Sequence, residues 1–102
     1  MRIIARSTLV EFWKLHPESE QGLKSWYHEA WHATWKTPQD IKARYQSASI
    51  LKHRRVVFNI AGNKFRLLCE VAYRIGVVYV KFVGTHKQYD GIDAENYHGK
   101  PV

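Results

Sequence analysis

The spacing of apolar and polar positions is most regular in the second half of the chain, where it predicts three consecutive strands. β-Branched and aromatic residues dominate three runs, Arg55–Ile60, Lys64–Ala72 and Val77–Val83. Gly62-Asn63, between the first two runs, suits the positive φ angles of a tight hairpin turn. The next connection, residues 73–76, is also short enough to reverse the chain. We therefore expect an antiparallel meander.

The residues that flank each turn fix a register, and this register separates the side chains onto two faces. In the second hairpin it pairs Leu68 with Lys81 and Arg66 with Val83. One face is apolar and is expected to be the core side: Val56, Phe58, Ile60, Phe65, Leu67, Cys69, Val71, Val78, Val80 and Phe82. The other face, which we call the cationic face, is polar and mainly basic: Arg55, Asn59, Lys64, Arg66, Glu70, Tyr79, Lys81 and Thr85.

Helical spacing precedes the meander, after a short edge strand that we expect at Arg2–Ala5. Ser7 and Thr8 offer an N-cap and Glu11 a capping-box partner, so a first helix is expected to end at Pro17. A second helix follows, with an apolar stripe made of Leu23, Trp26, Tyr27, Ala30 and Thr34.

A third helix and the end of the chain complete the expected fold. Thr37-Pro38-Gln39-Asp40 is a compact helix start and predicts a short helix over Gln39–Tyr45, followed by a polar loop at Gln46–Ser49. The polar segment Gly91–Val102 is expected to form a short helix and a frayed tail. The fold class is therefore α+β, with N-terminal helices packed on one face of an antiparallel sheet of three to four strands.

Four tryptophans lie in the helical part of the chain. Each can bury about 150–250 Å² of surface, which favours the core over base stacking or a cofactor site. We expect Trp13 and Trp26 in the core, whereas Trp31 and Trp35 suit a buried and an exposed role equally well.

Size and charge narrow the function. At 102 residues the chain is one domain, expected over residues 1–95, with a polar tail at 96–102. The net charge of +7 favours a polyanionic partner, nucleic acid before anionic membrane. No apolar run approaches the roughly 20 residues that span a bilayer, and no signal peptide is recognised, so we expect no membrane partner. The single cysteine, Cys69, lies on the expected core face and suits a reducing, cytoplasmic location.

The sequence offers little for a metal or a cofactor. His28 and His32 lie four residues apart on a helix, which suits zinc, but no third ligand accompanies them and a surface pair is the simpler interpretation. No phosphate-binding loop, dinucleotide fingerprint, nucleophile elbow or cysteine pair occurs. We therefore expect neither cofactor nor metal.

Residues with useful chemistry gather where the third strand ends. The cationic face carries its lysines and Arg66 toward the exit of that strand, which continues into His86 and Tyr89. RNA cleavage by its own 2′-hydroxyl needs a base for that hydroxyl, cations on the phosphorane and an acid for the leaving 5′-oxygen. Histidine carries protons near neutral pH, and arginine makes forked contacts to phosphate. The candidate catalytic residues are Arg66, His86, Tyr89 and Lys64, and the candidate RNA-binding residues are Asn59, Lys81, Lys87 and Arg55.

Structural roles stay open for several of these side chains. Arg55 faces Glu70, and a cross-strand ion pair explains these two residues better than catalysis does. Lys64 beside a turn is also explained by solvation. From residue chemistry alone, ordering of the loop that follows the third strand explains His86 and Tyr89 better than catalysis does.

Four runs of the sequence carry a family resemblance: W-K-T-P-x-D-I-K (35–42), S-A-S-I-L (47–51), R-V-V-F-N-I-x-G-N-K-F-R-L (55–67) and F-V-G-T-H-x-x-Y-D (82–90). With these runs the chain, from Met1 to about Ala94, resembles the HigB family within the RelE-like toxins of type II toxin–antitoxin systems. The resemblance implies a ribosome-dependent mRNA endonuclease that inhibits translation, with its active site on the sheet face opposite the helices. The positions that match the family motif are Asn59, Lys64, Arg66, His86 and Tyr89.

The resemblance also implies partners. These are a cognate helix-turn-helix antitoxin (HigA-like), the ribosome and mRNA, with operator DNA contacted only through the antitoxin. Charge alone supports an alternative, a small basic nucleic-acid-binding protein without catalytic activity, and an inactive toxin relic that keeps antitoxin binding is a third hypothesis. A helix-turn-helix protein encoded beside this chain favours the toxin pair over the second hypothesis.

Overall fold

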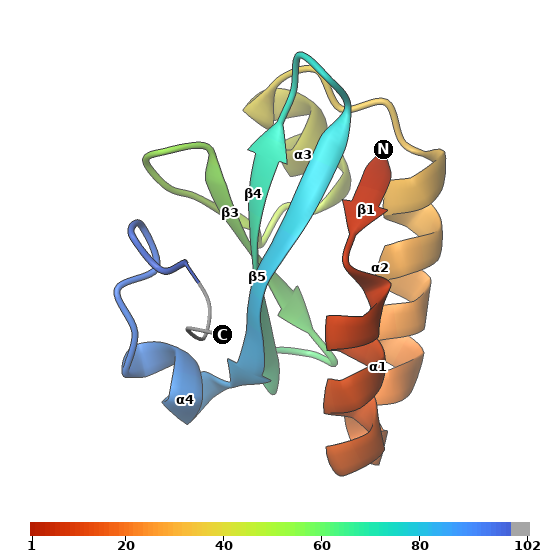
Figure 1. Ribbon diagram of the computed structural model, residues 1–102, viewed down its shortest axis with the longest axis vertical. Coiled ribbons are helices and arrows are strands. Elements are labelled where there is room, and N and C mark those ends of the chain that lie inside the picture. Colours follow the sequence, from red (N-terminus) through yellow and green to blue (C-terminus); the bar gives the residue numbers. More distant parts are fainter. Residues whose placement is uncertain (99–102) are drawn as a thin grey trace.

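The computed structural model describes residues 1–98 and has an α+β fold (Figure 1). Within these residues five strands form one sheet in the order β1-β5-β4-β3-β2. Helices α1 and α2 cover one face of the sheet, and no described helix is long and apolar enough to cross a membrane. The elements in chain order are β1 (Arg2–Ile4), α1 (Arg6–Leu15), a 3₁₀ turn (Pro17–Ser19), α2 (Glu20–His32), α3 (Pro38–Arg44), β2 (Ser49–Ile50), β3 (Arg55–Ile60), β4 (Phe65–Ala72), β5 (Val77–Thr85) and α4 (His86–Asp90).

The sheet is larger and less regular than the three to four antiparallel strands expected from the sequence. β1 forms an edge strand as expected, but it runs parallel to β5, with Arg2 opposite Val77. β2 lies at the end of the segment expected to be a polar loop, and it pairs with β3. Both residues of β2 are exposed, so no buried alternation reveals this strand in the sequence. The expected strand number and the purely antiparallel pairing are therefore wrong.

The helices follow the predicted pattern with one difference at a cap. The N-cap of α1 is Ala5, and no side chain among residues 1–98 caps this helix, so the expected capping box at Ser7 or Thr8 is wrong. The chain enters α1 directly from β1, which leaves no polar residue in front of the first turn. The start of α3 is as expected, since Thr37 Oγ1 accepts a hydrogen bond from Asp40 N at 3.3 Å and Asp40 Oδ2 accepts one from Thr37 N at 3.2 Å.

The core lies between the sheet and helices α1 and α2. Trp26 is 1% exposed and makes an edge contact with Phe58, and Trp13 is also buried, as predicted. Trp35 is buried and stacks near Phe58, whereas Trp31 is 52% exposed, so the two undecided tryptophans have different roles. Among the described residues Trp13, Trp26, Trp35 and Phe58 belong to one hydrophobic cluster.

A β-bulge changes the register of the second hairpin. β4 and β5 pair as expected as far as Cys69, which faces Val80, but Leu68 then faces Phe82. Lys81 is the extra residue of the bulge, so the expected pair of Leu68 with Lys81 is wrong. Each side chain of β5 after the bulge lies on the face opposite to the one predicted.

The bulge corrects the expected composition of both faces. Phe82 leaves the core and lies on the cationic face, whereas Val83 packs against the core. Arg66 faces Gly84 instead of Val83, and Thr85 leaves the cationic face. Alternation could not reveal this change because Phe82 and Val83 are both apolar.

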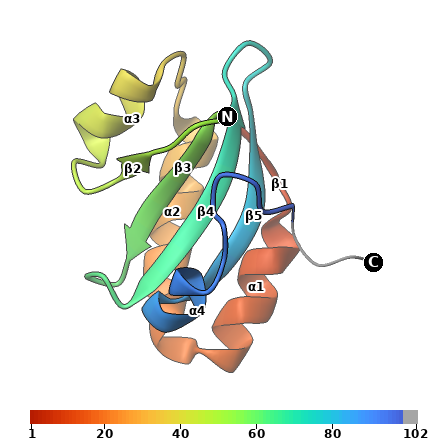
Figure 2. The same cartoon turned by 90° about the vertical axis from the view of Figure 1, so that its left-hand side faces the viewer.

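The C-terminal part follows a different course from the one expected. α4 begins directly after β5, so the short helix predicted within Gly91–Val102 is wrong. Residues 91–98, which we call the strap, contain no helix and run back over the cationic face, as the dark blue segment in Figures 1 and 2 shows. The end of the predicted tail, residues 99–102, lies outside the described residues. The domain boundary expected at residue 95 stays a prediction.

Candidate functional site

Helix α4 is tied to the first hairpin by its own first residues. The backbone N–H of His86 donates to the carbonyl of Lys64 at 3.3 Å. Thr85 and Gln88 form a capping box, in which Thr85 Oγ1 accepts from Gln88 N at 3.1 Å and Gln88 Oε1 accepts from Thr85 N at 2.9 Å. These bonds place Lys64 and His86, which are distant in sequence, beside each other.

Gly84 allows a close approach between α4 and the cationic face. A Cβ atom at this position would come within 2.6 Å of the Phe82 ring and 2.8 Å of Gln88 Oε1. Any other residue would therefore push the Phe82 ring or α4 away. Since Gly84 faces Arg66 across the sheet, the Phe82 ring lies beside the arginine.

Arg66 and Tyr89 form the centre of the site. The Arg66 side chain is half-buried, and Nη1 donates to the carbonyl of Asn63 at 3.0 Å, which fixes the side chain and uses one of its five N–H donors. Tyr89 packs near Phe82, with 6.5 Å between ring centroids. Burial raises the pKa of the Tyr89 hydroxyl, and the positive charge of Arg66 opposes this shift. The Tyr89 phenol is therefore protonated near neutral pH and acts as a hydrogen-bond or proton donor.

His86 is exposed at the start of α4. Its Nδ1 lies 3.6 Å from Asp90 Oδ2, one helical turn away, which favours an orientation with Nε2 directed elsewhere. Lys64 at the hairpin and Lys87 on α4 are also exposed. The structure thus brings together all four candidate catalytic residues, with Lys87 at the margin.

Two candidate RNA-binding residues lie farther into the sheet. Asn59 faces Arg66, and its Nδ2 donates to the carbonyl of Ser47 at 3.1 Å, which links β3 to the loop before β2. Lys81, the bulge residue, has its Nζ 5.7 Å from the centre of the Tyr79 ring. Asn59 therefore has a structural contact, while the Lys81 ammonium lies near Tyr79, toward the start of β5 and away from α4.

Arg55 is separated from the other candidates. It is 1% exposed, and its Nε lies 3.3 Å from Glu70 Oε1, as the predicted cross-strand ion pair requires. Its Nη1 donates to the carbonyl of Ala94 at 3.3 Å and to the carbonyl of Tyr97. Because the strap covers this guanidinium, Arg55 has no free surface for RNA, and we keep it out of the proposed RNA-binding set.

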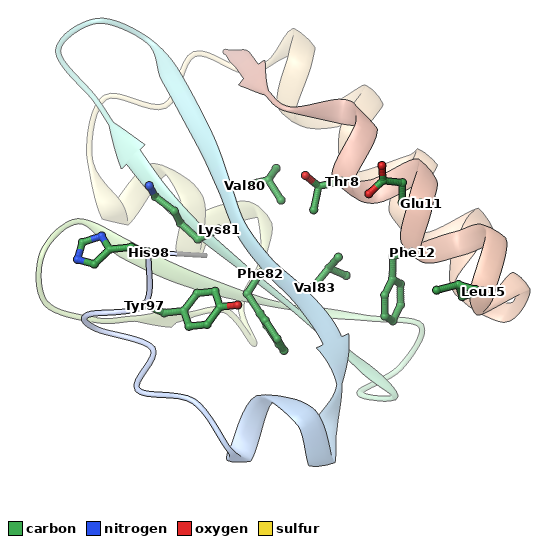
Figure 3. A pocket seen from close by; sticks show the side chains of 10 residues that line it. All are labelled: Thr8, Glu11, Phe12, Leu15, Val80, Lys81, Phe82, Val83, Tyr97 and His98. Atoms are coloured by element: carbon green, nitrogen blue, oxygen red, sulfur yellow. The ribbon is translucent and has the colours of Figure 1, made fainter. Parts of the chain in front are cut away.

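Sequence reasoning missed the aromatic part of the cationic face. Phe82 arrives there through the bulge, and Tyr97 arrives on the strap, with ring centroids 5.4 Å apart. The one sequence signal was Gly84, which directly follows the predicted run Val77–Val83 and which the structure places inside β5, where a glycine indicates a bulge or a close approach. A pocket of about 470 Å³ adjoins both rings along β5 (Figure 3), lined by Thr8, Glu11, Phe12, Leu15, Val80, Lys81, Phe82, Val83, Tyr97 and His98.

The described residues contain no group of three or more histidine, cysteine, aspartate or glutamate side chains placed to hold a metal ion. His28 and His32 lie side by side on α2, with ring centroids 4.6 Å apart. They are exposed and lie on the helical side of the sheet, opposite the cluster around Arg66.

Comparison with known proteins gives matches over most of the chain. Residues 19–92 match the family model HigB_toxin, described as the RelE-like toxic component of a toxin–antitoxin system. The chain is 27% identical over 92 residues to the mRNA interferase toxin HigB of Escherichia coli strain K12, with 88% of each chain covered. The proteins named mRNA interferase HigB from Escherichia coli O157:H7 and Shigella flexneri match with the same identity and coverage. The matched region includes β3, β4, β5 and α4, and therefore the whole cluster around Arg66.

Proposed function

This chain belongs to the HigB family of RelE-like toxins, and from that premise we propose that it is an mRNA interferase that cuts messenger RNA on the ribosome. The observation that carries the proposal is the cluster of Lys64, Arg66, His86 and Tyr89 on an accessible face of the sheet. Two cations, an imidazole and a protonated phenol are the groups that transesterification at a phosphate needs.

The reaction we propose uses the RNA 2′-hydroxyl as nucleophile and no metal. Arg66 holds the phosphate and stabilises the charge that develops on it, since a guanidinium is never deprotonated near neutral pH. His86 accepts the proton of the 2′-hydroxyl, with its ring oriented by Asp90. Tyr89 donates a proton to the leaving 5′-oxygen, which agrees with the raised pKa of its hydroxyl. Lys64 adds positive charge beside the phosphate.

The shape of this surface supports dependence on the ribosome. His86, Lys64 and Lys87 are exposed, and Arg66 lies at the surface beside them instead of in an enclosed cleft. Such a surface provides few contacts to hold a flexible RNA strand in one position. We propose that the ribosome presents the mRNA and supplies the missing positioning.

The family description as a toxin–antitoxin component implies a cognate antitoxin. We propose a helix-turn-helix (HigA-like) antitoxin as this partner, with operator DNA bound only through it, and a cytoplasmic location for the complex. With a net charge of +7, the chain would attract an acidic segment by electrostatic steering, and added salt would slow the association.

The test is induction of the chain without an antitoxin, followed by mapping of mRNA 5′ ends. New 5′ ends in translated messages, absent after induction of Arg66→Ala, would support the proposal. The purified protein should cut mRNA in a translation mixture and leave the same RNA intact without ribosomes. The +7 charge also fits a nucleic-acid-binding protein without catalysis, and growth arrest with no new 5′ ends would favour that function.

A further inference from the structure

Most of the strap lies past the region that matches the family model, which ends at residue 92. It is nevertheless held against the sheet through its main chain and one carboxylate. The buried Arg55 donates to the carbonyls of Ala94 and Tyr97, the backbone N–H of Lys52 donates to Glu95 Oε2 at 3.4 Å, and His53 Nδ1 lies 3.1 Å from the Glu95 carbonyl oxygen. None of these bonds uses the Tyr97 side chain.

The Tyr97 ring instead continues a run of aromatic rings toward the candidate site. It meets Phe82 at 5.4 Å with an angle of 78° between the ring planes, and Phe82 lies 6.5 Å from Tyr89. In an edge contact of this kind the neighbour covers at most one face of a ring. All three rings are half-buried, and the run ends beside Arg66.

The pocket along β5 gives these rings an accessible side. Its volume of about 470 Å³ lies within the usual range for small-molecule sites. Figure 3 shows Tyr97 and Phe82 on the strap side of β5 with Lys81 and His98 near them, and Thr8 and Glu11 across the strand on α1. Aromatic faces suit a base, Lys81 suits a phosphate, and the oxygens of Thr8 and Glu11 accept hydrogen bonds from exocyclic amino groups.

We propose that Tyr97 and Phe82 form a stacking site for one nucleobase of the RNA, next to the phosphate held at Arg66. This inference rests on the proposed function and deepens it, because it adds a base-binding position supplied by the strap. An apolar antitoxin segment in the same pocket is the competing occupant. The rings favour a base because they continue directly into the catalytic cluster and because Lys81 and His98 line the same wall.

The experiment uses an RNA oligonucleotide with 2′-O-methyl groups, which block cleavage, and with the fluorescent base 2-aminopurine at one position in turn. The full-length protein is added to this oligonucleotide in two titrations, one with the oligonucleotide free in solution and one with it bound as mRNA to ribosomes. At one position the wild type should quench the fluorescence by stacking. Tyr97→Phe should behave like the wild type, because stacking needs the ring and not the hydroxyl. Tyr97→Ala should bind about 5- to 100-fold more weakly without quenching.

Trp31→Ala is the matched control, since Trp31 is an exposed aromatic residue on α2 and its loss should leave RNA binding unchanged. Thermal unfolding of Tyr97→Ala should match the wild type, because carbonyl groups and Glu95 hold the strap. If Tyr97→Ala does not fold, the titration of the wild-type protein tests the inference by itself. The inference is overturned if the wild type leaves the 2-aminopurine fluorescence unchanged at every position of the RNA.

Cleavage in a translation mixture separates the inference from the proposed function. A raised KM for Tyr97→Ala with kcat little changed would support a stacking site. A Tyr97→Ala protein with wild-type cleavage and RNA affinity would overturn it and leave the mRNA interferase intact, and weakened antitoxin binding in that variant would assign the rings to the antitoxin. A wild type that binds and quenches RNA without cutting it would support the stacking site and refute the proposed function.

Discussion

The two ends of the cationic face carry similar charges in different surroundings. At the end beside α4, Arg66 is half-buried, and its side chain donates a hydrogen bond to a carbonyl of its own hairpin. At the other end, Arg55 is 1% exposed and contacts Glu70 and two strap carbonyls. Both arginines come from the same hairpin. The difference teaches that the covering segment, and not the strand pattern, decides whether a cation is available for a phosphate or stabilises the fold.

The largest effect is expected for Arg66→Ala. Loss of one preorganised donor at a developing charge typically lowers the rate about 10²–10³-fold, so toxicity and mRNA cleavage should disappear while the protein stays folded and binds its antitoxin. Arg74→Ala is the matched control, because Arg74 is exposed in the turn at the opposite end of the same strands. Thermal unfolding and 5′-end mapping measure both effects. A folded Arg66→Ala protein with undiminished cleavage would refute the site assignment.

Tyr89→Phe tests the proton-donor role at the same end and should lower cleavage about 10²-fold. Burial raises the pKa of the Tyr89 hydroxyl above its ordinary value of about 10, so the protonated, active form should persist and the wild-type rate should stay flat from pH 7 to about 9. If Tyr89 acted as a base, the rate would rise over this interval instead. Tyr73→Phe is the matched control, because burial also raises the pKa of the Tyr73 hydroxyl and no part in cleavage is proposed for it. This variant should leave cleavage unchanged at every pH.

The sequence predicts one arginine environment better than the other. The first hairpin register placed Arg55 opposite Glu70 and Arg66 opposite Asn59 correctly, because Gly62-Asn63 fixes the turn and the apolar alternation is unambiguous there. Apolar alternation could not predict the bulge at Lys81, since apolar residues follow it on both faces, and Gly84 was the one signal of an irregularity there. The strap was missed for another reason, because its bonds to Arg55 use backbone carbonyls, which any polar sequence contains.

The comparison is sharpened by replacing Arg55 and measuring stability. Arg55→Ala leaves Glu70 partly buried without this partner and leaves two strap carbonyls without their donor. We expect the free energy of unfolding to fall by about 2–3 kcal/mol. This is near the lower end for a broken buried pair, because Arg54 also reaches Glu70 at 3.3 Å. Arg54→Ala removes the exposed arginine from the same carboxylate and should cost less than about 1 kcal/mol. Denaturant unfolding measures both values. Equal losses would show that burial under the strap does not distinguish the two arginines.

The smallest expected effect is at the margin of the accessible end, where Lys87 lies on the outer surface of α4. An exposed lysine that contacts a phosphate contributes through charge and counterion release, so Lys87→Ala should weaken RNA binding a few-fold for every sequence and lower the slope of log Kd against log salt by about one. Lys24→Ala removes an exposed lysine from α2, where no RNA contact is proposed, and should change neither quantity. RNA titrations at several salt concentrations give the Kd and the salt slope for both variants. If both variants change the slope equally, the RNA responds to the overall charge of the protein, and the accessible end of the cationic face is no better a binding surface than the helical side.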